Sequence, residues 1–132
     1  MAMTDALVLG GVRTPFARYG GSLSHLRLDD LLGMTMRGAC ERVGLPLEQV
    51  EDIIAGCVNT AHEGMGDVAR WAALAAGFPD SVAGATLNRY CGSSLSARRQ
   101  PLSAIASTNG KVALLSATVE VRATAPGILV TQ

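Results

Sequence analysis

The stretch LNRYCGSSLSA (87–97) places a cysteine between a β-prone run and a run of small residues that can begin a helix. Cys91 would then lie beside the first free backbone N–H groups of that helix, and these donors and the helix dipole favour a thiolate. Gly92 allows close backbone approach, and Ser93 and Ser94 are too small to shield the sulfur. The pattern therefore indicates a nucleophilic cysteine at a strand-to-helix turn. The alternative is that Cys91 is a small buried side chain that only packs.

The remaining candidate nucleophiles and bases lack such a setting. Cys40 lies in a segment with helical periodicity and Cys57 in an apolar run, so both are expected to pack in the core. Ser93 is a rival nucleophile, but no base accompanies it locally. His25 and His62 fall in polar, loop-like stretches and are predicted to be surface residues rather than catalytic bases. Neither metal-ligand spacing nor a dinucleotide or phosphate loop is recognisable, so we expect no metal and no bound cofactor.

Alternating strands and helices must position these residues. Apolar runs predict strands at 6–9, 52–58, 85–90 and 112–115. Helical periodicity predicts helices at 28–43, 66–76 and 92–106. The first two helices are expected to end at Gly44 and Gly77, each followed by a proline. Strands separated by helices require crossover connections, which predicts an α/β fold with a mostly parallel sheet.

Composition sets the broad class. The 132 residues suffice for one domain, and 48% hydrophobic with 17% charged residues is typical of a globular chain. Eleven basic residues balance eleven acidic ones, so we expect no nucleic-acid or membrane partner. No apolar run approaches the ~20 residues that span a bilayer, and the N-terminus lacks the basic start of a signal peptide. Three widely spaced cysteines favour a reduced, cytoplasmic location.

Four stretches resemble the thiolase family of acyl-CoA C-acyltransferases. They are GGVRTPFARYGGSLS near the start, DIIAGCVNTA, DVARWAALAAGFP and, above all, LNRYCGSSLSA. The resemblance is strong over residues 5–97 and weak over residues 98–132. It predicts that residues 1–132 form a thiolase-like N-terminal half-domain, truncated relative to the family.

The resemblance implies an enzyme, a transferase of acyl groups in acetyl-CoA and lipid metabolism, with Cys91 as its nucleophile. An acyl group would pass between Cys91 and CoA or acyl-CoA, forming or cleaving short β-ketoacyl-CoA esters such as acetoacetyl-CoA or oxoadipyl-CoA. CoA would be a substrate, not a cofactor. Asn88 and Arg89 would have structural or interface roles. The expected assembly is a homo-oligomer or an association with a complementary thiolase half.

Departures from the family pattern favour a fragment. The activating histidine and second cysteine of the family lie in a second half, whose motifs this sequence does not contain. In LLSATVEV, Ala117 and Thr118 replace glycines of a family turn, so strain is expected there. The alternative to an acyltransferase is therefore a non-catalytic remnant, or an interaction module that associates with a full-length thiolase-like chain.

The third helix contains a further departure. Pro101 cannot donate to the carbonyl of Ala97, and its ring clashes there, so it is expected to end or kink the helix. Arg98 shares a helical face with Leu95, at a position that is apolar in the family. Because a buried, unpaired guanidinium is costly, Arg98 and Arg99 are expected to reach solvent or an acidic partner such as Glu120.

Overall fold

The computed structural model describes the backbone of residues 8–107, 113–122 and 125–129, and the side chains of residues 8–100. The helices are α1 (Leu28–Val43), α2 (Val68–Ala75) and α3 (Ser93–Ser107), with short 3₁₀ helices η1 (Leu47–Gln49) and η2 (His62–Gly64). The strands are β1 (Val50–Cys57), β2 (Ala83–Leu87), β3 (Ala113–Arg122) and β4 (Ala125–Leu129). Within these described ranges, no helix is long and apolar enough to cross a membrane.

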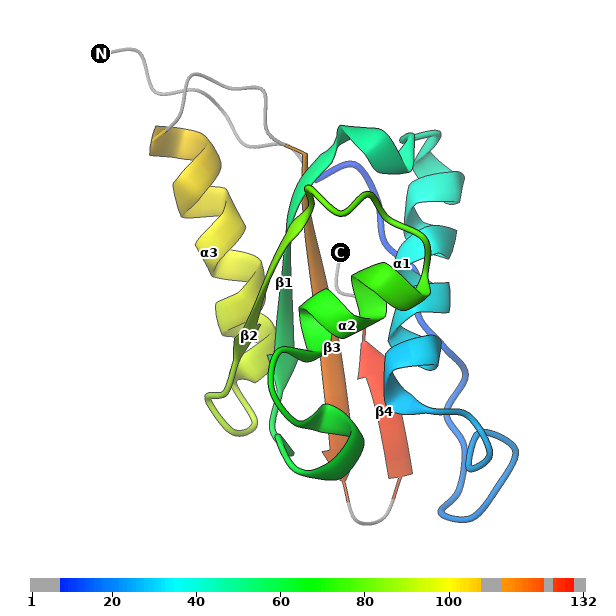
Figure 1. The fold of residues 1–132 in the computed structure, drawn as a ribbon. Helices are drawn as coiled ribbons and strands as arrows, with labels where there is room; N and C mark the ends of the chain where they lie inside the picture. The colour runs from blue at the N-terminus through cyan, green and yellow to red at the C-terminus, as the bar shows by residue number, and fades with distance from the viewer. Residues whose placement is uncertain (1–7, 108–112, 123–124, 130–132) are drawn as a thin grey trace.

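The strands form one four-stranded sheet in the order β2-β1-β3-β4 (Figure 1). β1 pairs in parallel with β2 on one side and with β3 on the other, and β4 runs antiparallel to β3. α1 and α2 pack against each other, α2 also packs on β1 and β2, and α3 packs against β1 and β3. This is the α/β fold with a mostly parallel sheet that the alternation of strands and helices predicted.

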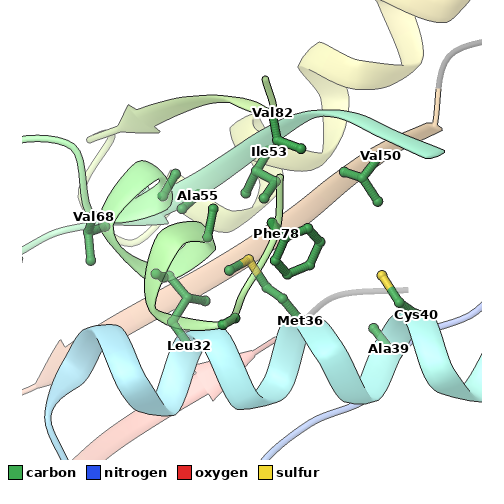
Figure 2. Packing of buried hydrophobic residues seen from close by; sticks show 14 of the residues in the cluster. Leu32, Met36, Ala39, Cys40, Val50, Ile53, Ala55, Val68, Phe78 and Val82 are labelled. Carbon is green, nitrogen blue, oxygen red and sulfur yellow. The ribbon is translucent and has the colours of Figure 1, made fainter. Parts of the chain in front are cut away.

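β1 is the central strand and is buried on both faces. Figure 2 shows Ile53 and Ala55 of β1 in one hydrophobic cluster with Met36 of α1. Gly56 directly follows Ala55 and faces α3 instead, because successive residues of a strand point to opposite faces of the sheet. A strand covered on both faces explains why this segment is almost continuously apolar.

α1 has the predicted bounds and ends where glycine was expected. Gly44 has a φ of 69°, a left-handed conformation that glycine adopts without steric cost. The N–H of Leu45 then donates to the carbonyl of Cys40 at 2.9 Å, which completes the cap. The turn after α2 likewise contains a left-handed glycine, Gly77, with a φ of 78°. Both predicted helix ends are therefore confirmed.

α2 is shorter than the predicted 66–76, and only part of its apolar surface is buried. Trp71 is 57% exposed and Ala75 is also exposed. The residues that are buried are Val68, Ala69, Ala72 and Ala73. A Cβ added to Gly33 of α1 would lie 2.9 Å from the carbonyl oxygen of Ala72, so the two helix backbones pack closely. Because the two helix backbones lie this close, only small side chains fit between α1 and α2, and the indole ring of Trp71 lies outside the contact.

α3 continues through Pro101 as far as Ser107, so Pro101 does not end this helix, which was one of its two expected effects; the other, a kink, stays a prediction. Proline removes one helical hydrogen bond. However, α3 packs against β1 and β3, and most of a helix's stability in a protein comes from such packing. Tertiary contacts therefore outweigh the local preference at this position.

The buried face of α3 differs from the predicted one. Leu95 is 68% exposed, and Arg98 and Arg99 are exposed with it, which confirms the expectation for the two arginines. The described side chains that α3 buries are those of Ser93 and Ala97, both 0% exposed. Small side chains are buried because the helix backbone approaches Gly56 of β1 closely.

The first predicted strand, 6–9, is not observed where it can be checked. Val8 and Leu9 lie in no strand and are 51% and 69% exposed, and residues 6 and 7 lie outside the described residues. An apolar run becomes a strand only where a neighbouring edge offers hydrogen-bond partners. Both edges of β1 and of β3 are already paired, so a further strand could join the described sheet only at the outer edge of β2 or β4, and Val8 and Leu9 pair with neither.

The last part of the sheet contains a longer strand than predicted, β3, and one further strand, β4. β3 extends to Arg122, well past 115, and Ala117 and Thr118 lie within it, paired with Ala55 and Gly56. The expected turn at these two residues is thus replaced by a continuous strand. β4 was not predicted; it contains Pro126, and proline is tolerated in an edge strand such as this one.

Candidate functional site

Cys91 lies in the turn between β2 and α3 and is exposed. The N–H of Ser96 donates to the carbonyl of Gly92 at 3.0 Å, which makes Gly92 the N-cap of α3. Cys91 therefore lies one residue before the N-cap and two before Ser93, the first helical residue, in a strand-to-helix turn as the sequence predicted. Its exposure excludes the alternative that Cys91 is a buried packing residue.

Tyr90, which precedes the cysteine, holds an unusual backbone conformation. Its φ is 49°, in the left-handed region that costs a non-glycine residue about 1–2 kcal/mol. Ser93 helps to hold the turn, since its hydroxyl donates to the carbonyl of Tyr90 at 2.6 Å and accepts from the N–H of Arg89 at 2.9 Å. Ser93 is also 0% exposed, so a buried hydroxyl engaged in two hydrogen bonds is a poor rival nucleophile.

Asn88 connects this turn to the end of the neighbouring strand. Its side-chain oxygen accepts from the N–H of Tyr90 at 3.0 Å, and its side-chain nitrogen donates to the carbonyl of Val58 at 3.0 Å. Arg89 donates from its guanidinium to the hydroxyl of Ser96 at 3.2 Å, which links the turn to the first turns of α3. Both residues thus make structural contacts, in agreement with the sequence-based expectation.

Gly56 of β1 lies against the first residues of α3, and no sequence-based expectation concerned it. A Cβ at Gly56 would lie 2.7 Å from the carbonyl carbon of Ser93 and 2.8 Å from the backbone nitrogen of Ser94. The absence of a side chain in β1 therefore lets the start of α3 rest directly on the strand. An isolated glycine inside an apolar strand pattern was the available signal for this close approach.

The other candidate residues lie outside the turn between β2 and α3. Cys40 and Cys57 are 1% and 0% exposed, and desolvation by burial raises the pKa of both thiols above the ordinary value. His25 and His62 are exposed, so the predicted surface location of the histidines and core location of these cysteines are confirmed. In the described part of the chain, no group of three His, Cys, Asp or Glu residues is arranged to hold a metal ion.

Comparison with known proteins gives a consistent picture. The family model described as "Thiolase, N-terminal domain" matches residues 6–121. The chain is 42% identical over 128 residues to the 3-oxoadipyl-CoA/3-oxo-5,6-dehydrosuberyl-CoA thiolase of Escherichia coli K12, covering 96% of this chain and 32% of that relative. It is 37% identical over 128 residues to the beta-ketoadipyl-CoA thiolase of Pseudomonas putida, again 96% of this chain and 32% of the relative.

A solved structure shares the fold. The acetyl-CoA acetyltransferase of Bacillus anthracis superposes with a TM-score of 0.82 at 31% identity, over 91% of this chain and 30% of that one. The chain thus spans about a third of the length of these relatives, at 32% of the Escherichia coli protein. Because the family model matches most of its length, the chain belongs to the thiolase family.

Proposed function

We propose that this chain is the nucleophile-bearing part of a cytoplasmic thiolase-type acyltransferase and that Cys91 carries the acyl group. The single observation that supports this most is the position of Cys91: exposed, one residue before the N-cap of α3, in a turn anchored to two strands. A thiol at this place is open to a large substrate, and its backbone is held on both sides.

In the degradative direction, the Cys91 thiolate attacks the β-keto carbonyl of a β-ketoacyl-CoA. The carbon–carbon bond next to that carbonyl breaks, and its electron pair leaves on the acetyl-CoA fragment, which takes up a proton. The shortened acyl group remains as a thioester on Cys91. The thiol of a second CoA then attacks this thioester and regenerates Cys91, so one difficult step becomes two easier ones. The synthetic direction is the reverse sequence.

The substrate class we propose is a short β-ketoacyl-CoA ester, such as acetoacetyl-CoA or oxoadipyl-CoA. Relatives at 42% and 37% identity are named for 3-oxoadipyl-CoA and beta-ketoadipyl-CoA, which supports this choice. The chain spans 32% of those relatives, and neither of its histidines accompanies Cys91 in the turn. We therefore propose that the proton-transfer groups come from a complementary thiolase half and that the chain alone turns over slowly.

Acylation of Cys91 tests this proposal directly. The chain is incubated with acetyl-CoA or acetoacetyl-CoA, and the protein is read by intact mass and peptide mapping. We expect slow addition of one acetyl group at Cys91 and none in Cys91→Ser. Addition that survives Cys91→Ser would assign the chemistry to another residue. No addition to the parent chain at saturating donor would favour the non-catalytic interaction module.

Self-association is a second expected property. Trp71 of α2, Tyr90 of the turn and Leu95 of α3 are 57%, 78% and 68% exposed. These are among the large hydrophobic side chains that the described part of the chain exposes, and exposed apolar groups favour association. We expect sedimentation of the purified chain to show dimers or larger species. A monomer at high concentration would contradict this prediction.

A further inference from the structure

The left-handed conformation of Tyr90 requires support from its surroundings. A non-glycine residue at a φ of 49° persists only where neighbouring groups hold it. Ser93 holds the carbonyl side of Tyr90, through its hydroxyl at 2.6 Å and its N–H at 3.0 Å. Asn88 holds the other side, because its side-chain oxygen accepts from the Tyr90 N–H at 3.0 Å.

Asn88 also reaches a part of the chain that is distant in sequence. Its side-chain nitrogen donates to the carbonyl of Val58, 30 positions away, just past the end of β1. One amide group therefore joins the central strand to the residue that precedes the cysteine. The hydroxyl of Ser93 makes contacts inside the turn, whereas Asn88 ties the turn to the sheet.

We propose that Asn88 is a positioning residue. It holds Tyr90 in its left-handed conformation and thereby fixes the orientation of the Cys91 side chain. The proposal rests on the proposed function, in which Cys91 is the reacting group. Without Asn88, Tyr90 loses the contact that holds its N–H, and relaxation to a negative φ turns the following residue. The sulfur of Cys91 then no longer holds its present exposed position in the turn before α3.

The test measures alkylation of the folded chain by iodoacetamide, with peptide mass spectrometry reading each cysteine separately. Asn88→Ala is expected to lower the labelling rate of Cys91 by about threefold, the scale of losing one net hydrogen bond that holds the turn. Cys40 and Cys57 are buried and serve as controls within the same molecule, since they stay unlabelled while the fold is intact. Asn59→Ala is the matched variant: it removes a similar side-chain acceptor, for the N–H of Ala61, beside Val58 but outside the turn.

A second substitution separates positioning from general support. Glycine adopts positive φ without steric cost, so adding Tyr90→Gly to Asn88→Ala is expected to restore the Cys91 rate to within about twofold of the parent. Unchanged labelling of Cys91 in Asn88→Ala would overturn the proposal. A lowered labelling rate in Asn88→Ala that Tyr90→Gly does not restore would also overturn it. Faster labelling of all three cysteines would also overturn it, because Asn88 would then merely stabilise the fold.

These readings are independent of acyl transfer. If the parent chain takes no acyl group from acetyl-CoA but the alkylation pattern is as expected, the proposed function fails and the positioning role of Asn88 stands. If Cys91 is acylated but Asn88→Ala leaves both its alkylation and its acylation unchanged, the proposed function stands and the positioning role fails.

Discussion

Iodoacetamide is expected to label Cys91 at least about a hundredfold faster than Cys40 or Cys57 in the folded chain, since buried groups react only through opening of the structure. Cys91 is exposed, whereas Cys40 and Cys57 are 1% and 0% exposed. Burial also raises the pKa of the Cys40 and Cys57 thiols, so a smaller fraction of each is the reactive thiolate at any given pH.

The measurement is a pH series from about 6 to 9, which brackets the ordinary thiol value of ~8.5, with each cysteine read by peptide mass. Labelling of Cys40 and Cys57 should stay low through this range, because raised pKa values keep them protonated and burial keeps the reagent out. Addition of urea should then bring all three cysteines to similar rates, which controls for peptide recovery. Equal rates for all three in the folded chain would end the interpretation of Cys91 as the nucleophile.

Gly56→Ala is expected to lower the free energy of unfolding by about 1–3 kcal/mol, the usual cost of overpacking a core. In most strands, replacing glycine by alanine would raise the free energy of unfolding, because glycine weakens a strand by its backbone entropy. Here the added Cβ would lie 2.7 Å from the carbonyl carbon of Ser93 and 2.8 Å from the nitrogen of Ser94. Backbone atoms cannot rotate away as a flexible side chain can, so α3 must shift.

Gly38→Ala is the matched control. Gly38 lies inside α1, and a Cβ built on it meets nothing within 4 Å. Alanine there should raise the free energy of unfolding by about 0.5–1 kcal/mol, because it is the better helix former. Urea denaturation of both variants measures the two effects, which should have opposite signs. A Gly56→Ala chain as stable as the parent would show that α3 does not rest on β1 as described.

Local residue types were enough to predict a large part of this molecule. The bounds of α1 (Leu28–Val43) agree with its apolar periodicity, and Gly44 ends it because a left-handed residue is needed there. The strand–turn–helix around Cys91 also follows from a β-prone run, a glycine and small residues in sequence. These features depend on neighbours within a few positions along the chain, which a sequence pattern records.

Other features depended on what the rest of the chain offers. Val8 and Leu9 are apolar but join no strand, since an apolar run becomes a strand only where the folded chain brings it to an open sheet edge. α3 passes through Pro101 because packing on β1 and β3 outweighs one lost hydrogen bond. The link from Asn88 to Val58 spans 30 positions and needs the parallel pairing of β1 and β2 to exist first. Edges, packing partners and such distant contacts arise only when the chain has folded, so residue types along the sequence cannot express them.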